Sequence, residues 1–420
     1  MKKCILAILV MAVLVPAAQA EDDLAALKKK VKAQEDSIAQ MKEQISAVEQ
    51  RTGAAGGDNW WDRINWSGDF RYRHEMSNDE DSLNNAKGTQ QRQRVRARIK
   101  MQAQVNEEVD VTVRLATDGS SGASATSTNQ TLEGKLDSKE VWLDQMFMTY
   151  SPQDLEGFNV LAGKMANPFY RAGGNQLIWD SDVTPEGIVL QTTTELSEET
   201  SIGFNAGGIW LEELWASAGT SSTEGSDEYL WAAQLFINQA LDATSSLTAG
   251  ASYYDFVNVQ NSGGYAAGNS EVSGLLANDY NLLEFFAALN TEVNGTPLSV
   301  YGSYVQNDGT ESGYNQDTAY LLGLKVNKCT TPGTWQAGYE YRDVEADAVV
   351  GYFTNADSVG GGTTGQTGGL GSETHQVSYK HQLMKNVQGG VKYIMGDQID
   401  SGGDNQDFNR LQLDLIVKFK

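Results

Sequence analysis

Apolar and polar residues alternate in short stretches over most of the chain beyond residue 60. In residues 62–75 (DRINWSGDFRYRHE), one set of alternate positions is apolar or aromatic, and the other is mostly charged. Residues 408–420 (FNRLQLDLIVKFK) repeat this pattern. A period of two residues is that of a β-strand with one face in apolar surroundings and the other in water. Because no helical stripe of useful length interrupts it, the pattern predicts an all-β domain over residues 62–420.

The alternating stretches have about the length of a membrane-spanning β-strand. Short turns alternate with long links rich in Gly, Ser, Thr, Asn and Asp, which is the arrangement of bacterial outer-membrane barrels. Only a closed barrel satisfies the backbone hydrogen bonds of strands in lipid, and a large one encloses a water-filled lumen. We therefore predict a transmembrane antiparallel β-barrel of about sixteen strands, over residues 62–75, 92–105, 108–117, 139–150, 157–165, 184–194, 199–210, 228–238, 244–257, 280–292, 298–307, 317–327, 334–349, 373–383, 386–399 and 407–419.

The N-terminal part of the chain has a different pattern. Residues 1–20 show the basic start, apolar run and small-residue cleavage site of a secretory signal peptide. Residues 21–52 carry apolar residues in a heptad pattern without Gly or Pro, which predicts a coiled-coil helix. A single amphipathic helix packed on the body is the alternative. The heptads permit a trimer, and the Gly-rich residues 53–61 form a linker to the barrel.

Composition excludes some classes of partner. The net charge is −24, from 31 Lys and Arg against 55 Asp and Glu, which argues against a nucleic-acid partner. Cys4 lies in the signal peptide, so Cys329 remains alone and no intramolecular disulfide is expected. The chain has no CxxCH motif for covalent haem, and we expect no cofactor. A mean hydropathy of −0.41 fits a secreted soluble protein as well as a β-barrel, so the pattern must decide between them.

The most prominent charged feature is a row of basic residues spaced two apart within residues 91–106. This spacing places them on one face of one strand, and basic residues on the neighbouring strands extend the row. Cations are costly on the lipid face of a barrel, so we expect the row to line the lumen and attract anions. Pairing with acids on an infolded loop is the alternative, and both can hold. The expected pore-lining residues are Arg71, Arg73, Arg92, Arg94, Arg96, Arg98, Lys100 and Arg114.

One long link, residues 166–183, combines Pro, aromatic and charged residues densely. We expect it to fold into the lumen as a constriction opposite the basic row. Its candidate constriction residues are Arg171, Asp180 and Asp182. Acids facing a basic wall would produce a transverse field that selects ions by charge. The alternative is a loop that only covers the mouth of the barrel.

The same region carries a family resemblance. The segments GKMANPFY and LIWDSDVTPEGIVLQ resemble the bacterial putative-porin family. The resemblance covers essentially residues 21–420 and is most specific over residues 167–187. It implies an outer-membrane barrel of sixteen or so strands that passes small solutes as a trimer. It implies no particular substrate.

The sequence shows no recognisable catalytic motif. The three histidines, His74, His375 and His381, fall in the apolar phase of their strands, and neither a Ser-His-acid set nor a metal-ligand spacing is visible. We therefore expect neither an enzyme nor a metal site. The leading hypothesis is a porin in the outer membrane of a Gram-negative bacterium, surrounded by lipid, with its coiled coil in the periplasm. It would give small hydrophilic solutes or ions a passive path and form a homotrimer.

Two other functions remain open at this point. The barrel is alternatively a sleeve around a multihaem cytochrome in an electron conduit across the outer membrane. It is otherwise an anchor whose coiled coil touches the peptidoglycan of the cell wall. Copurification with a cytochrome would favour the sleeve, whereas conduction after removal of residues 21–50 would favour the pore over the anchor.

Overall fold

The computed structural model describes residues 60–80, 86–118, 124–213, 226–265, 267–358, 371–399 and 405–420. The chain divides into two compact units, Met1–Arg63 and Ile64–Lys420. In the first unit only Trp60–Arg63 is described, as a 3₁₀ turn (η1). The expected signal peptide and the coiled-coil helix over residues 21–52 lie outside the described residues. Within the described residues, no helix is long and apolar enough to span a membrane.

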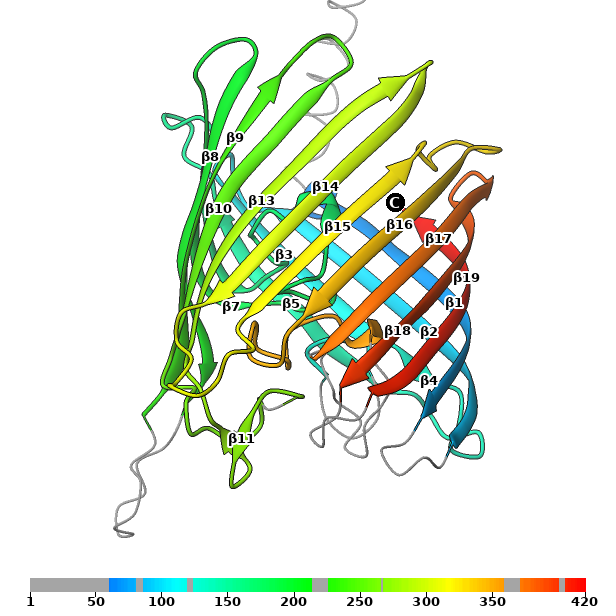
Figure 1. The fold of residues 1–420 in the computed structure, drawn as a ribbon. Coiled ribbons are helices and arrows are strands. Elements are labelled where there is room, and N and C mark those ends of the chain that lie inside the picture. The colour runs from blue at the N-terminus through cyan, green and yellow to red at the C-terminus, as the bar shows by residue number, and fades with distance from the viewer. Residues whose placement is uncertain are drawn as a thin grey trace, which may run out of the picture. The chain divides into compact units, whose positions relative to one another are not determined.

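The second unit is a closed antiparallel barrel, with sixteen wall strands among its described residues (Figure 1). Consecutive wall strands pair with each other, and β1 pairs with β19, so the sheet has no free edge. The wall strands are β1 (Ile64–Glu80), β2 (Ala86–Gln104), β3 (Val109–Thr117), β5 (Val141–Tyr150), β6 (Phe158–Lys164), β7 (Glu186–Glu195), β8 (Thr200–Glu212), β9 (Glu228–Ala240), β10 (Ser246–Val257), β13 (Tyr280–Val293), β14 (Thr296–Asn307), β15 (Thr318–Val326), β16 (Trp335–Val344), β17 (Ser372–Met384), β18 (Val387–Ile399) and β19 (Asn405–Phe419).

Three further strands of two residues each lie in the long links: β4 (Gln130–Thr131), β11 (Glu271–Val272) and β12 (Leu275–Leu276). β11 and β12 pair only with each other. β4 pairs with β2 at Arg94 and Val95, beyond the stretch of β2 that pairs with β3. The link between β3 and β5 therefore continues the wall of the barrel towards the long-link end.

The alternation in the sequence determines which side chains face outward. On β1, Phe70 and Tyr72 are 44% and 39% exposed on the outer face, whereas Arg71 and Arg73 are 9% and 3% exposed on the inner face. The outer face is thus apolar and aromatic, as a lipid-facing surface must be. Leu413 and Leu415 of β19 show the same exposed outer position.

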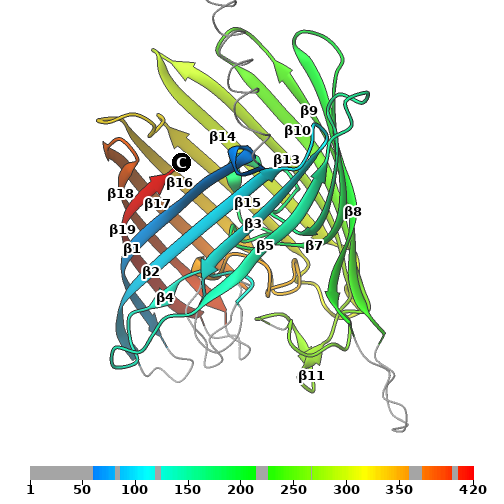
Figure 2. The same ribbon diagram turned by 180° about the vertical axis from the view of Figure 1, so that it is seen from behind.

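The prediction of a sixteen-strand barrel is confirmed, because each predicted stretch overlaps one wall strand. Long links gather at one end of the barrel and short turns at the other (Figures 1 and 2). One predicted boundary is wrong. The stretch 334–349 was expected to be a single strand, but β16 ends at Val344, and Ala348, Val349 and Val350 are buried together. Consecutive burial is incompatible with an alternating strand, and these residues instead join an apolar cluster inside the barrel.

That apolar cluster contradicts the expectation of a polar inner face on every strand. Many inner-face residues from β9 to β15 are large, apolar and buried, and the link between β6 and β7 packs on them. The strand residues are Leu230, Tyr254, Phe256, Leu282, Phe286, Tyr301, Val305 and Leu321. The lumen is therefore divided: one part of the wall is covered by packed loops, and the basic strands lie opposite.

Candidate functional site

The link between β6 and β7 (residues 165–185) folds into the barrel, as expected for a constriction loop. Its 3₁₀ turn η2 (Ala172–Gly174) contacts β13 and β14. The Lys325 ammonium of β15 donates to the Gly173 carbonyl oxygen and lies 5.0 Å from the centroid of the Tyr301 ring. Gly173 has φ +61°, and a Cβ there would come within 2.3 Å of the Tyr301 ring. A larger residue would therefore push the loop off this wall.

A side chain of β9 fixes the start of this loop. The Gln234 amide accepts a hydrogen bond from the Tyr170 backbone N–H at 2.7 Å and donates one to the Tyr170 carbonyl at 2.9 Å. Gln234 itself belongs to a buried polar row in which five wall strands, β8, β9, β10, β13 and β14, each contribute one residue. The row is Asn205, Gln234, Ser252, Glu284 and Ser303, and hydrogen bonds of 2.6–3.0 Å join each neighbour to the next.

Aromatic packing holds the middle of the loop. The Trp179 ring lies 5.6 Å from the Tyr254 ring of β10 and 5.7 Å from the Phe353 ring, centroid to centroid. Phe169 meets Tyr254 edge-on at 5.4 Å. These contacts bury the apolar side chains of residues 165–185 against β9 and β10, which leaves the loop's acidic residues for other neighbours.

A second inner loop meets the first. It follows β16 and ends in the 3₁₀ turn η3 (Ala356–Ser358), which contacts β18. The Asp180 backbone N–H donates to the Phe353 carbonyl at 2.7 Å, and the Thr354 hydroxyl donates to the Leu177 carbonyl at 2.7 Å. Residues 345–358 therefore brace residues 165–185. This second loop was not predicted from the sequence, because its residues 345–349 continue the alternating stretch 334–349 that was expected to be one strand.

The eight basic residues of the predicted row lie together on the inner faces of β1, β2 and β3. The strand register sets Arg71 opposite Arg96, Arg73 opposite Arg94, and Lys100 opposite Arg114. Lys392 of β18 and Arg410 of β19 join them through a shared partner described below; the sequence analysis missed both. We call this group of ten the basic arc: Arg71, Arg73, Arg92, Arg94, Arg96, Arg98, Lys100, Arg114, Lys392 and Arg410.

Most of the basic arc pairs with carboxylates on the strands themselves. Arg73 binds Asp414 of β19 with two hydrogen bonds, of 2.7 and 2.9 Å. Asp69 accepts from both Arg96 and Arg98, at 2.7 and 2.8 Å. Similarly, Glu75 pairs with Arg92 and Arg94, and Asp144 pairs with Arg114. Pairing with acids was foreseen, but most of those acids lie on the wall rather than on an infolded loop.

Arg71 and Lys100 differ from the rest of the basic arc. Among the described residues, neither has a carboxylate within 4.0 Å. Arg71 is 9% exposed and donates to the Asn129 side chain, next to β4. Their two positive charges are therefore not balanced by a neighbouring acid.

The three loop residues singled out in the sequence have different roles. Asp182 faces the basic arc, with an oxygen 3.4 Å from Arg98 Nη1, and it also accepts from the Thr128 hydroxyl at 3.2 Å. Asp180 is buried between the two loops, and burial together with the Asp182 charge raises its pKa to about 8. Arg171 donates to the carbonyls of Asn175 and Trp179, so it shapes its own loop. Burial lowers the pKa of Arg171.

Asp357, on η3 of the second loop, is the acid that sequence reasoning missed. Its carboxylate lies 3.4 Å from Lys392 Nζ, 3.4 Å from Arg410 Nη1 and 3.7 Å from Arg73 Nη1. Burial opposes ionisation of Asp357, but Lys392, Arg73 and Arg410 outweigh it and hold its pKa well below the usual range. No sequence signal separates this residue from other acids of the long links, because its partners come from distant strands.

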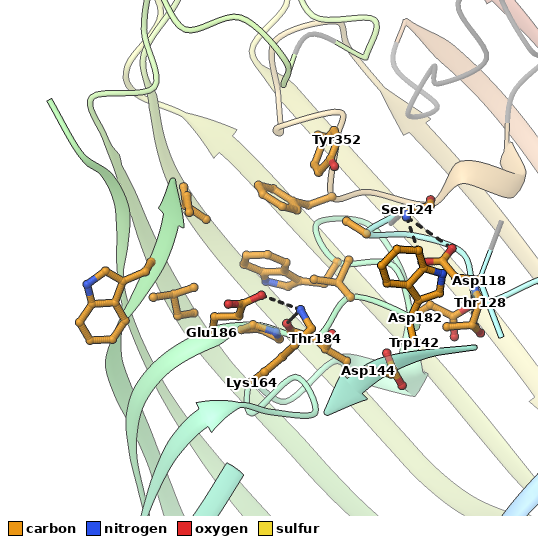
Figure 3. Close-up of a pocket in the computed structure, with 18 of the residues that line it drawn as sticks. Asp118, Ser124, Thr128, Trp142, Asp144, Lys164, Asp182, Thr184, Glu186 and Tyr352 are labelled. Carbon is orange, nitrogen blue, oxygen red and sulfur yellow. Dashed lines mark hydrogen bonds and ion pairs between the residues drawn. The ribbon is translucent and has the colours of Figure 1, made fainter. Parts of the chain in front are cut away.

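A cavity of about 440 Å³ lies near the long-link end, beside the first loop (Figure 3). β6 and β7 are short here, so the ends of β5 and β8 flank the cavity, and Lys164 and Glu186 form an ion pair of 2.8 Å at its side. Figure 3 shows Asp118, Thr128 and Asp182 grouped on the other side. Its lining carboxylates, Asp118, Asp144, Asp182, Glu186 and Glu212, outnumber its one lysine. This space is an acidic vestibule that leads to the basic arc.

The described residues contain no group of three or more His, Cys, Asp or Glu side chains that could hold a metal ion. His74 and His375 hydrogen-bond to Gln93 and Tyr339, at 2.5 and 2.7 Å. The partners of both histidines lie on adjacent strands of the wall. The described histidines thus belong to the polar and aromatic surface of the wall.

Comparison with solved structures identifies other barrels of this kind. OprB of Pseudomonas putida superimposes with a TM-score of 0.52 at 12% identity, over 87% of this chain and 97% of that one. The outer-membrane channel DcaP of Acinetobacter baumannii gives 0.48 at 15% identity, over 85% and 97%. The trimer form of OmpT, an outer-membrane protein of Vibrio cholerae, gives 0.45 at 13%, over 85% and 99%. The likeness to OprB supports the barrel fold.

The family match rests on the sequence itself. No curated protein sequence matches this chain. The model of the family described as "Putative porin" matches residues 59–294 and 262–419, which together span the whole barrel. The chain therefore belongs to the Putative porin family, and it is a porin-like barrel of the outer membrane.

Proposed function

We propose that the barrel is a diffusion porin that passes small hydrophilic solutes and ions through the space between the basic arc and the two inner loops. The observation that carries this proposal is the division of the lumen. Packed loops cover the inner face of β9 to β15, whereas β1 to β3, β18 and β19 present charged side chains. A barrel of sixteen strands is wide enough for an aqueous path. No energy-coupling element is needed for this function.

The charge of the path favours anions. Among the described residues, eight of the ten cations of the basic arc pair with six carboxylates, so the ten cations exceed these carboxylates by four positive charges. The carboxylates are Asp69, Glu75, Asp144, Asp182, Asp357 and Asp414. Low-dielectric walls focus such a field and raise the local concentration of counter-ions. The acidic vestibule adjoins this stretch, because Asp144 and Asp182 line both.

Within this proposal, the residues have distinct roles. The basic arc attracts anions, and Asp182 and Asp357 narrow the path from the loop side. Asp180 and Arg171 hold the loops rather than line the path. Arg71 and Lys100, which have no carboxylate within 4.0 Å among the described residues, supply part of the excess positive charge that sets selectivity.

The sleeve around a cytochrome is less compatible with this interior. A sleeve needs a lumen wide enough for a folded protein, and here two loops pack across it. An enzymatic role likewise has no supporting observation. We therefore keep the pore as the proposed function, without a cytochrome partner and without a cofactor.

The N-terminal segment complements the barrel in this proposal. Residues 1–20 are a signal peptide, residues 21–52 a periplasmic coiled coil that supports a homotrimer, and residues 53–61 a linker. Contact of the coiled coil with the cell wall is an additional role that does not require the pore. Cross-linking of the protein in intact membranes tests this part, with trimers expected for the full chain.

Swelling of proteoliposomes tests the pore itself. Vesicles that contain the refolded protein are diluted into isotonic arabinose or raffinose. We expect rapid swelling in arabinose and slow swelling in raffinose, because the inner loops restrict the size of the path. Equal and negligible swelling in both sugars, with protein that migrates as a folded barrel, would contradict the proposal.

A further inference from the structure

The carboxylates of the basic arc fall into two groups by the length of their shortest ion pair. Each wall carboxylate makes at least one close contact, such as Arg73 to Asp414 at 2.7 Å and Arg98 to Asp69 at 2.8 Å. The loop carboxylates lie farther away, with Asp182 at 3.4 Å from Arg98 and Asp357 at 3.4–3.7 Å from its three cations. A charge-assisted hydrogen bond is strong at about 2.7–2.9 Å, so the loop carboxylates are held more weakly.

Asp357 has an unusual surrounding for a loop residue. Three cations from three different strands approach its one carboxylate: Arg73 of β1, Lys392 of β18 and Arg410 of β19. Arg73 already uses Nε and Nη2 on Asp414, so only its Nη1 is directed at Asp357. The Asp357 side chain remains 27% exposed, more than the side chains of Arg73 and Arg410 at 4% and 8%. The wall thus supplies three cations around one carboxylate of the loop.

The turn that carries Asp357 is held by contacts that do not use its carboxylate. The Asp357 backbone N–H donates to the Asn355 side chain at 2.9 Å, and Arg410 donates to the Asp357 carbonyl at 3.1 Å. Thr354 binds the first loop through the Leu177 carbonyl. The carboxylate can therefore leave the three cations while the backbone of the turn stays in place.

We propose that Arg73, Lys392 and Arg410 form a binding site for the carboxylate of a permeating organic acid, and that Asp357 occupies this site when no solute is bound. The inference rests on the proposed pore and specifies its solute class. The Asp357 carboxylate shows how a solute carboxylate would bind, with its two oxygens near one nitrogen from each of the three cations. A solute carboxylate that displaces it would replace one set of ion pairs with another of the same kind, to the same three cations.

Neutralising Asp357 is the direct test, and isothermal titration of succinate into the detergent-solubilised full chain is the measurement. Asp357→Asn keeps the size of the side chain and removes its charge, so the three cations lose their internal occupant. We expect succinate to bind at least about tenfold more tightly to this variant, because the solute carboxylate no longer competes with the Asp357 carboxylate for the three cations. The control is Asp308→Asn, which removes the same negative charge from an exposed loop residue. It should leave the affinity for succinate unchanged.

A second substitution identifies the site. Among the described residues, the Lys392 side chain pairs with Asp357 alone, so Lys392→Gln removes a cation without leaving a wall carboxylate unpaired. The double variant Asp357→Asn, Lys392→Gln should bind succinate at least about fivefold more weakly than Asp357→Asn alone. If the double variant binds succinate as tightly as Asp357→Asn, the anion site lies elsewhere and the inference is wrong. If Asp357→Asn binds inorganic phosphate more tightly than succinate, the carboxylate class is wrong.

Conductance of the same samples separates this inference from the proposed function. A conducting protein in which Asp357→Asn leaves succinate affinity unchanged would overturn the inference and leave the pore standing. A silent protein in which Asp357→Asn gains succinate affinity would support the anion site and contradict the pore. Arabinose uptake should be the same with and without Asp357→Asn, because a change there would mean that the substitution had loosened the loop.

Discussion

The side-chain amide of Gln234 brackets the backbone of Tyr170, accepting from its N–H at 2.7 Å and donating to its carbonyl at 2.9 Å. The two residues are separated by 64 positions in the chain, on β9 and on the loop after β6. The Gln234 side chain thus supplies the hydrogen-bond acceptor and donor that the backbone of a neighbouring strand would supply to Tyr170. Because the loop has no strand beside it at this point, Gln234 fixes the height at which the loop crosses the lumen.

Gln234→Leu should therefore release the start of the first loop. The substitution leaves the Tyr170 N–H and carbonyl without partners, at a cost of about 1–3 kcal/mol for each buried group. We expect larger fluctuations of single-channel current, with the mean conductance raised. Thr248→Val serves as the control, since Thr248 lies on the inner face of β10 and binds Asn238 rather than the loop. Equal current noise in both variants would show that Gln234 does not hold the loop.

Arg71 and Arg73 are neighbours on one face of β1, yet their removal should have different effects. Arg73→Gln leaves Asp414 without its cation, and breaking such a buried pair costs about 3–5 kcal/mol. Arg71→Gln removes one hydrogen bond to Asn129 and leaves no carboxylate unpaired, for a loss of about 1 kcal/mol. Chemical unfolding in detergent measures both. A larger loss of stability for Arg71→Gln than for Arg73→Gln would refute this assignment.

The two variants also separate stability from selectivity. Each removes one positive charge from the path, so each should reduce the preference for anions in a salt gradient. The expected result is a similar change of reversal potential from two proteins of different stability. An unchanged reversal potential in Arg71→Gln would mean that this guanidinium does not act on the permeating ions.

Asp180 gives the barrel a dependence on pH. Its pKa is raised to about 8 by burial and by Asp182, whereas an unfolded Asp has a pKa of about 3.9. Between these values the folded state keeps a proton that the unfolded state has released, so the stability of the folded state decreases as the pH rises through this window. Above about pH 8 Asp180 is ionised in both states, and the stability of the folded state no longer changes through this group.

Asp180→Asn should remove this dependence, because the amide keeps the oxygen that accepts from the Asp182 N–H and cannot ionise. Between pH 6 and pH 9, the free energy of unfolding of the parent protein should fall by about 2 kcal/mol more than that of the variant. Denaturant titrations at the two pH values measure the difference. Parallel pH profiles for the two proteins would show that the Asp180 carboxyl is already ionised at neutral pH.

Removal of residues 21–52 separates the N-terminal segment from the pore. The barrel closes through pairs between β1 and β19 that do not involve this segment, so the shortened protein should still conduct. We expect fewer trimers on cross-linking, because the heptad pattern is lost. Loss of conductance from a shortened protein that still migrates as a folded barrel would place the segment in the pore mechanism instead.

The fold of this chain was largely predictable because lipid and water impose opposite demands on alternate residues. The pattern around Phe70 and Arg71 is enough to define a strand and its two faces. The prediction that the strand continues beyond Val344 was wrong, because contacts with the inner loops, not lipid and water, determine the burial of the residues that follow. Val349 and Val350 are buried together by the inner loops, and periodicity cannot report a contact made by a loop.

The candidate site was predictable on the wall and unpredictable on the loops. The spacing of Arg92 to Lys100 placed those residues on one face, because strand geometry is local. The tight wall partners Asp69 and Asp414 and the loop residue Asp357 depend on register and on chain reversal over long separations. Asp182 was found because its segment has an unusual composition, whereas Asp357 lies in a link that resembles every other one.

Single-channel recording in a planar bilayer under a tenfold KCl gradient tests the central claim most directly. The account predicts a steady conductance, with a reversal potential whose sign corresponds to anion preference, because positive charges outnumber the carboxylates beside the path. Folded protein that gives no conductance, or a steady conductance with cation preference, would contradict it.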